Sequence, residues 1–271
     1  MIPKLRNLMA MFASILMMPD TATAQTADFG TDDYINPDRP GIADGSNVVG
    51  AGRVQIEAGF QVEYRHDSSG HEHRLFVPTL LRFGLDRDWE LRVEGNTYSK
   101  ARSFDTAGIS SFNEGLAPTS IGLKYHFLDA SGERRPSVGA IIRLYPPSGS
   151  GDFKTFHTTG DLRLTADWDF APKWSLNPNV GVALYEDGGA TYTTELLAAT
   201  LSWNSSKVFN LFVDTGIQSR EGMNAKASVI FDAGTAVILG HNTQLDFSIG
   251  TGASGITPPH PFISAGVSRR F

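Results

Sequence analysis

The sequence predicts an all-β protein, a closed antiparallel transmembrane β-barrel of about 12 strands with both termini on the periplasmic side. Three observations lead to this prediction. Apolar and polar residues alternate along most of the chain, short and long connections alternate between these segments, and the chain closes on an aromatic residue, Phe271. Successive side chains of a strand point to opposite faces, so a period of two indicates an extended segment with one apolar and one wet face.

The first 24 residues have the order of basic, apolar and small residues that is typical of a cleavable secretory signal peptide. Lys4 and Arg6 precede an apolar run over residues 8–18, and Ala24 ends an Ala-Thr-Ala cleavage site. That run is too short to span a bilayer as a helix, which takes about 20 residues. The chain has no cysteine, so neither a lipoprotein anchor nor a disulfide scaffold is expected. Residues 1–24 should direct the protein across the inner membrane.

Residues 25–50 are rich in Asp, Gly, Asn and Pro and follow neither the helix period nor the strand period. We expect an irregular N-terminal segment that either fills the lumen or hangs in the periplasm, and the sequence does not choose between the two. The barrel should occupy residues 51–271.

The strands follow from the alternation; in the first, Val54, Ile56 and Phe60 are separated by polar residues. Twelve segments are expected, at residues 53–65, 74–85, 89–99, 117–128, 138–145, 161–170, 174–184, 191–203, 208–219, 225–239, 245–251 and 261–271. Residues 100–116 should form a long polar loop. The register of the eighth segment stays open, because Glu195 falls on its apolar face; a bulge near Glu195 would explain this.

A β-sandwich would also alternate, so lipid and a packed core must be separated by other evidence. Connections after the even-numbered segments are mostly tight, among them LDRD, APK and GHN, whereas several at the other end are long, as in outer-membrane barrels. All four tryptophans fall near the short turns, where amphipathic rings would form a girdle at the membrane surface: Trp89, Trp168, Trp174 and Trp203.

The terminal strand ending in Phe271 looks like the signal read by the bacterial outer-membrane assembly machinery. Closure of the sheet matters because each unpaired backbone group in hydrocarbon costs several kcal/mol. We therefore favour a barrel in the bacterial outer membrane over a secreted β-sandwich or lectin-like fold.

Composition excludes several function classes. Acidic residues exceed basic ones by six and no basic block occurs, so nucleic acid is not an expected partner. Residues 250–255 match G-x-G-x-x-G, but Pro258 and Pro259 follow instead of a helix. The pair His71 and His73 lacks a third fixed ligand. Neither a cofactor nor a metal is predicted; the expected partners are outer-membrane lipid, the assembly machinery and a small-molecule solute.

The register also predicts which side chains line the lumen. They are Arg53, Glu57, Arg74, Phe76, Arg82, Arg92, Glu94, Lys124, Arg143, Tyr145, Arg163, Asp167, Phe212 and Asp214. Two interpretations of the charges stay open: pairing across strands, at about 0.2–1 kcal/mol per pair, or a selectivity lining. The aromatic members either pack together or form a path for aromatic molecules. Pro78, Pro118 and Pro178 each remove a ladder hydrogen bond and could open the wall sideways.

Two short elements resemble the opening of a bacterial outer-membrane transporter family, the "MetA-pathway of phenol degradation" group. They are Asp38-Arg39-Pro40 and a Gly-x-x-Gln-x-Glu-x-Gly pattern at Gly52, Gln55, Glu57 and Gly59. The rhythm of strands and turns extends the resemblance to Phe271. The resemblance implies an outer-membrane channel for passive uptake of small solutes, in some members aromatic compounds, and it implies no catalytic residues.

Two other functions are considered. One is a sealed structural or adhesive barrel whose external loops, residues 100–116 above all, bind a partner. The other is an outer-membrane lipid hydrolase, which would need a serine nucleophile and a histidine base near the lipid surface. The histidines are expected in loops and turns or, for His126, facing inward, so none is expected on the lipid face.

Overall fold

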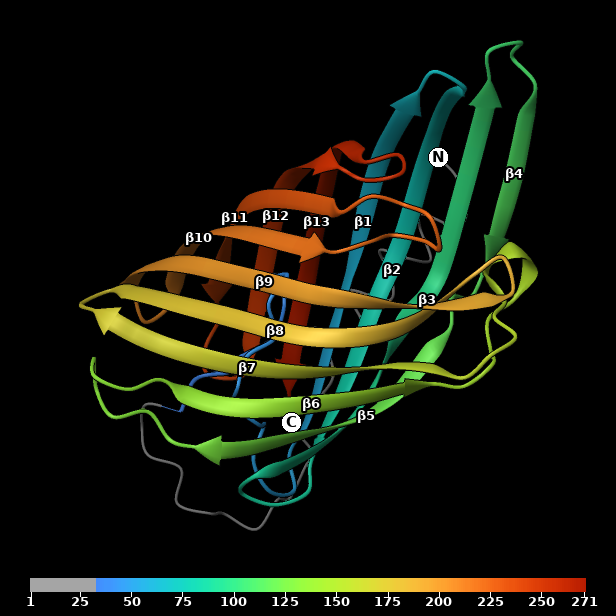
Figure 1. Ribbon diagram of the computed structural model, residues 1–271. Coiled ribbons are helices and arrows are strands. Elements are labelled where there is room, and N and C mark those ends of the chain that lie inside the picture. Colours follow the sequence, from blue (N-terminus) through green and yellow to red (C-terminus); the bar gives the residue numbers. More distant parts are fainter. Residues whose placement is uncertain (1–32) are drawn as a thin grey trace.

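The computed structural model describes residues 33–271. The expected signal peptide and residues 25–32 lie outside the described residues. Within the described part the chain is almost entirely strand (Figure 1). The strands are β1 (Val54–Asp67), β2 (Gly70–Gly84), β3 (Trp89–Asp105), β4 (Ser110–Gly115), β5 (Thr119–Leu128), β6 (Ser137–Tyr145), β7 (Thr159–Ala171), β8 (Trp174–Asp187), β9 (Ala190–Ser206), β10 (Phe209–Gln218), β11 (Ser228–Ile238), β12 (Thr243–Ser254) and β13 (Pro259–Arg270), with one 3-10 turn, η1 (Gly151–Phe153).

Twelve of these strands close into a barrel. Each pairs antiparallel with its neighbours in the order β2-β1-β13-β12-β11-β10-β9-β8-β7-β6-β5-β3, and pairing of β2 with β3 completes the ring. The remaining strand, β4, pairs only with the end of β3. The predicted fold class, a closed antiparallel barrel of 12 strands, is confirmed, and closure leaves no open sheet edge around the ring.

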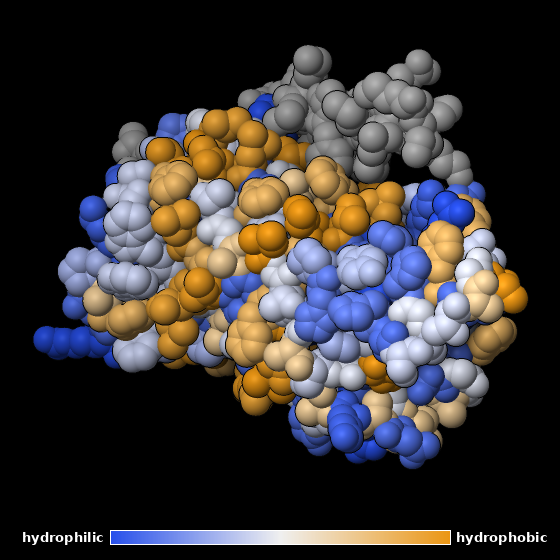
Figure 2. All heavy atoms as spheres, turned by 90° about the horizontal axis from the view of Figure 1, so that it is seen from above, coloured by the Kyte–Doolittle hydropathy of each residue, from blue (hydrophilic) through white to orange (hydrophobic). Residues whose placement is uncertain are grey.

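Apolar side chains cover the outside of the wall. In β5, Ile121 is 55% exposed, whereas Lys124, three positions along and on the other face, is fully buried. The same alternation of exposed apolar and buried polar residues runs through β6, β10 and β12. Figure 2 shows apolar side chains gathered over much of one face of the molecule. A wall this apolar is suited to hydrocarbon.

No helix among residues 33–271 is long and apolar enough to cross a membrane.

The prediction of a polar loop at residues 100–116 is wrong. Strand β3 continues to Asp105, and β4 returns along it, so that a two-stranded hairpin extends beyond the barrel wall (Figure 1). Tyr98 Oη donates a hydrogen bond to Glu114 Oε2 at 3.0 Å, and Lys100 Nζ lies 5.2 Å from the ring centroid of Phe112. Both faces of this hairpin carry polar residues, so its strand period is hidden in the sequence.

The register of the eighth segment, which the sequence leaves open, is regular at Glu195, and the bulge offered as an explanation does not occur there. The pairing of β8 with β9 runs without interruption through Val182 and Glu195, and the Glu195 carboxylate is exposed on the outer face. It accepts a hydrogen bond from Ser219 Oγ, which gives this outward charge a local partner. The register of β9 shifts instead beside Phe209, next to the turn into β10.

Four histidines expected in loops lie in strands. His66, His71 and His73 are exposed in β1 and β2, around the outward ring of Tyr64, and His260 lies in β13. The ring centroids of Tyr64 and His73 are 5.0 Å apart, because the two residues are cross-strand partners. The placement of these four histidines in loops is therefore wrong, and His66, His71 and His73 face outward at the rim formed by β1 and β2.

The tryptophans lie beside the short turns as predicted. Trp89 stacks on Tyr125 with ring centroids 4.4 Å apart, and Trp174 in β8 is the cross-strand partner of Trp203 in β9. Trp168 Nε1 donates to the carbonyl of Glu133 at 2.9 Å. These rings form an aromatic edge at the end of the wall where β2, β5 and β7 turn into the next strand.

Candidate functional site: the inner segment and the cavities beside it

Residues 33–50, called the inner segment from here on, lie inside the barrel and contact its opposite walls. Asp38 and Arg39 show this most directly. The Asp38 carboxylate accepts hydrogen bonds from Arg92 Nη1 at 2.5 Å and Lys124 Nζ at 3.0 Å, on β3 and β5. Arg39 Nη2 donates to Asp246 Oδ1 on β12 at 2.9 Å. Two adjacent residues of opposite charge thus tie the inner segment to two sides of the lumen.

Asp44 is a second anchor of the inner segment, on the side of the lumen where the arginines lie. Its carboxylate lies 2.7 Å from Arg143 Nη2, 3.1 Å from Arg92 Nη2 and 3.2 Å from Arg163 Nη1. The guanidinium groups come from β6, β3 and β7 and are largely buried. Buried charges are tolerated only when they are paired in this way.

The two family-like elements contact each other. Glu57 Oε2 accepts the backbone N–H of Arg39 at 2.9 Å, and Glu57 Oε1 accepts that of Asp38 at 3.2 Å. Gln55 Nε2 donates to Glu57 at 2.8 Å and fixes the carboxylate. The Asp-Arg-Pro element is therefore held by the Gln and Glu of the second element, on β1.

Arg82 joins this contact to the rest of the wall. Its guanidinium lies 3.0 Å from Glu57 and 2.8 Å from Glu90, and it also donates to the carbonyl of Asn47 at 2.9 Å. Glu90 in turn accepts the N–H of Val49 at 2.9 Å. The charges inside the barrel thus bind backbone groups of the inner segment as well as its side chains.

The inner segment is also held at both of its ends. Near its start, Asp33 pairs with Arg53 and, at 3.1 Å, with Arg270. Near its end, Ser46 donates its backbone N–H at 2.8 Å and its hydroxyl at 2.6 Å to the Asp167 carboxylate.

The arginines and the lysine around the inner segment keep its carboxylates charged. Burial alone would raise the pKa of Asp38, but Arg82, Lys124 and Arg92 outweigh that effect and hold the pKa well below its usual value of 3.8. Burial acts on Asp44 in the same way, and Arg143, Arg92 and Arg163 lower its pKa. Both anchors are therefore ionised at neutral pH.

The predicted lumen residues fall into two groups. Nine contact the inner segment: Arg53, Glu57, Arg82, Arg92, Lys124, Arg143, Arg163, Asp167 and Asp214. The others do not share in these polar contacts. Arg74 pairs with Glu72 at 2.7 Å, and Glu94 pairs with Arg143 at 2.6 Å. Phe76 lies in β2, and Tyr145 and Phe212 line the cavities described next.

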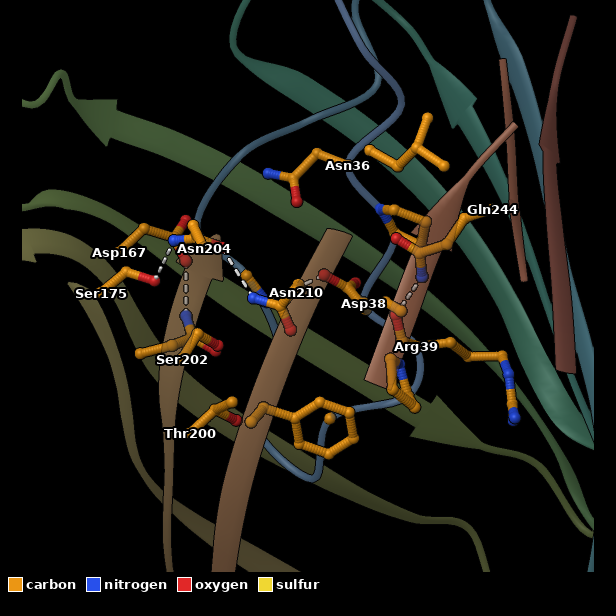
Figure 3. A pocket seen from close by; sticks show the side chains of 18 of the residues that line it. Asn36, Asp38, Arg39, Asp167, Ser175, Thr200, Ser202, Asn204, Asn210 and Gln244 are labelled. Atoms are coloured by element: carbon orange, nitrogen blue, oxygen red, sulfur yellow. Dashed lines mark hydrogen bonds between the residues drawn. The ribbon is translucent and has the colours of Figure 1, made fainter. Parts of the chain in front are cut away.

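Two of the cavities beside the inner segment are lined by its residues 38–41. The turn-side cavity, of about 350 Å³, reaches the turn between β9 and β10 and is lined mainly by polar side chains (Figure 3). Within it, Asn210 Nδ2 donates to Asn204 at 2.7 Å and Asn204 Nδ2 donates to Ser175 at 3.2 Å. The loop-side cavity, of about 470 Å³, lies toward the other end and includes Tyr145.

The sequence pattern alone does not identify Asp38, Arg39 and Asp44 as interior anchors. Their signal was the combination of acidic residues and one arginine in an irregular segment that precedes a barrel rich in inward charges. Within residues 33–271, no group of three or more His, Cys, Asp or Glu side chains is placed to hold a metal ion.

Comparisons with known proteins agree with this architecture. The chain is similar in fold to the crystal structure of the COG4313 outer membrane channel from Pseudomonas putida F1, with a TM-score of 0.65 and 12% identity over 88% of this chain and 100% of that one. It is also similar to the β domain of the Bordetella autotransporter BrkA, with a TM-score of 0.56 and 14% identity over 80% of this chain and 99% of that one. At these identities the likeness shows the fold alone. No curated protein matches the sequence. The family model described as "Putative MetA-pathway of phenol degradation" matches residues 37–271, and the chain belongs to that family.

Proposed function

We propose that the protein is an outer-membrane channel for passive uptake of small solutes. The observation that carries the proposal is that the inner segment leaves two cavities, of about 350 and 470 Å³, along its length. Both are lined by Asp38, Arg39, Pro40 and Gly41, so the same short stretch of chain separates them. Displacement of that stretch would join them, and their sizes suit a small organic molecule.

Aromatic solutes are the class that the lining favours. Tyr145 and Phe262 line the loop-side cavity and Phe212 lines the turn-side cavity, where amides and hydroxyls of Asn204 and Ser202 also face the space. An aromatic ring that carries a hydroxyl could pack on these aromatic side chains, and its hydroxyl could hydrogen-bond with the amides and hydroxyls. The phenol-degradation description of the family supports the same class.

A sideways exit through the wall is part of the proposal. Pro78 and Pro118 line the loop-side cavity at the place where β3 changes partner from β5 to β4. The pairing of β2 with β3 shifts register beside Pro78, and the hydroxyls of Thr79 and Thr97 lie 3.0 Å apart there. Pro178 is different, because Asn177 Nδ2 donates to the carbonyl of Ala166 at 2.7 Å and so replaces a missing backbone bond.

The test combines conductance with uptake. The purified protein in a planar bilayer should conduct, and cells that lack it should take up radiolabelled phenol more slowly at limiting concentration. The natural chain has no cysteine, so a disulfide between Thr79→Cys and Thr97→Cys can be made without side reactions. Oxidation of that pair should slow phenol uptake and leave ion conductance unchanged.

The matched control is a cross-strand pair on the outer face of β8 and β9, Leu184→Cys with Thr193→Cys, whose oxidation should change neither readout. Equal uptake with and without the protein would contradict the aromatic substrate. Equal uptake in the oxidised and reduced Thr79 and Thr97 pair would contradict the sideways exit.

A sealed structural barrel is the second candidate. It is favoured by the ion pairs of Asp38 and Asp44, which fill the side of the lumen formed by β3, β5, β6 and β7. Absence of both conductance and solute uptake in the wild-type protein would support this candidate over the channel.

A further inference from the structure

Four oxygen-bearing side chains meet on the inner wall, on the side away from the arginines. Asp214 in β10 is the cross-strand partner of Thr200 in β9 and of Asp232 in β11. Ser248 in β12 lies diagonally from Asp232, whose direct partner is Gly250. All four side chains face inward and are more than nine-tenths buried, or at that limit for Thr200.

Each of the four has an oxygen atom with no hydrogen-bond partner among residues 33–271. These atoms are Thr200 Oγ1, Asp214 Oδ1, Asp232 Oδ1 and Ser248 Oγ. Leaving one such buried group unsatisfied costs about 1–3 kcal/mol, and more for a charged one. Four of them in one patch of wall indicate that something with positive charge or hydrogen-bonding capacity belongs between them.

In the part of the chain that the structure describes, no basic side chain forms an ion pair with either carboxylate. The other buried acids around the inner segment each have a partner: Asp38 has Lys124 at 3.0 Å, Asp44 has Arg143 at 2.7 Å and Asp246 has Arg39 at 2.9 Å. Within residues 33–271, Asp214 and Asp232 form no ion pair, and the contact of Asp214 with the inner segment is the backbone N–H of Ile42, 3.2 Å from Oδ2. Two neighbouring carboxylates without a counter-ion repel each other.

Two occupants would relieve the repulsion. A proton shared by the carboxyl groups would neutralise one of the two charges and leave the other without a counter-ion. A hard cation would take all four oxygens as ligands and would neutralise both charges. Carboxylate and hydroxyl oxygens are the ligands that such cations prefer, and two negative charges match a divalent ion.

The cluster is also accessible. Thr200 lines the turn-side cavity, Asp232 and Ser248 line the loop-side cavity, and Gly41 of the inner segment lines both. A Cβ at Gly41 would lie 3.2 Å from Thr200 Oγ1 and 3.7 Å from Asp214 Oδ2, so the inner segment passes directly against the cluster. We propose that Thr200, Asp214, Asp232 and Ser248 form a Ca²⁺ site between the two cavities, beside the inner segment.

The test measures Ca²⁺ binding directly and does not depend on channel activity. The full mature chain is refolded in detergent, free of lipopolysaccharide, treated with EDTA and titrated calorimetrically with CaCl2 at pH 7.5. We expect one saturable site per barrel and a higher thermal midpoint with Ca²⁺ than with EDTA. Asp232→Asn should weaken binding at least ten-fold, and Ser248→Ala, which keeps both charges, should weaken it several-fold.

The control is Asp152→Asn, which removes an exposed acid in η1 and should bind Ca²⁺ like the wild type. If Asp232→Asn does not refold, Thr200→Ala takes its place with the same expectation as Ser248→Ala. Absence of saturable Ca²⁺ binding in the wild type, with no effect of Ca²⁺ on the thermal midpoint, would overturn the proposal in favour of a shared proton. Undiminished binding in both Asp232→Asn and Ser248→Ala would overturn it as well.

Discussion

The guanidinium of Arg39 occupies the space where Gly59 would carry a side chain. A Cβ built on Gly59 would lie 2.4 Å from Arg39 Cζ, and one on Gly266, across the strand pair, would lie 2.3 Å from Arg39 Nε. The last glycine of the Gly-x-x-Gln-x-Glu-x-Gly element thus forms one side of a slot for the arginine of Asp-Arg-Pro. The two elements that characterise the family opening are the two halves of one contact.

This contact predicts a coupling between Gly59 and Arg39. Gly59→Ala should displace the guanidinium from Asp246 and lower the free energy of unfolding by about 1–3 kcal/mol, as overpacking does. In an Arg39→Ala background the same change should cost little, because the slot is then empty. Urea unfolding of the four proteins in detergent, followed by tryptophan fluorescence, measures the coupling. Equal costs in both backgrounds would show that the slot is not what requires glycine.

Asp38 should be the most sensitive single anchor of the inner segment. Asp38→Asn leaves Arg82, Arg92 and Lys124 buried without their shared counter-ion, and loss of one partner of a buried charge cluster costs about 3–5 kcal/mol. We expect a lower unfolding midpoint and a larger bilayer conductance as the inner segment detaches. The exposed acid Asp152 provides the control, since Asp152→Asn should stay within about 0.5 kcal/mol of the wild type. An Asp38→Asn variant as stable as that control would be the contrary result.

The same anchors predict how the protein responds to acid. The pKa values of Asp38 and Asp44 are lower in the folded chain than in the unfolded one, so their contribution to stability is complete above the unfolded pKa of 3.8. It is lost as the pH falls from there toward the lower folded values. Conductance should therefore be constant between pH 7 and about pH 5 and should rise only below about pH 4. A rise that begins near pH 6 would assign the release of the inner segment to histidines instead.

The strand period predicts which residues of the wall face inward, but it does not predict the contacts that they make inside the barrel. The alternation predicts that Lys124 faces inward, because Leu123 and Tyr125 flank it in an alternating segment, and the structure confirms that it is buried. Its partner Asp38 lies 86 positions away in a segment with no period, and nothing local in the sequence marks that contact. The strand period shows the face that a residue occupies, whereas the partner across the lumen depends on barrel closure.

Two local errors have the same origin. The sequence of the β3–β4 hairpin predicts a loop because its two faces are both polar, so the alternation that marks a strand is absent. Glu195 interrupts the apolar face of its segment and so suggests a bulge, but its contact with Ser219 supplies a local partner near the end of β10. Alternation of apolar and polar residues reveals strands that have one apolar face. It does not reveal strands that extend beyond the apolar part of the wall, where both faces are polar.

The aromatic edge predicts where each part of the wall lies in the bilayer. Trp89 stacks on Tyr125 beside a short turn, whereas Ile142 is exposed in the middle of β6, next to Leu123 and Leu162. Amphipathic rings favour the interface, and aliphatic side chains favour the hydrocarbon centre. With the other three tryptophans replaced by Phe, the fluorescence of Trp89 should be quenched more by lipids brominated near the headgroup than by lipids brominated near the chain ends. A single tryptophan at Ile142→Trp, in a background where Trp89 is also Phe, should show the reverse order. The same order of quenching at both positions would contradict a wall that spans the membrane with its tryptophans at one surface.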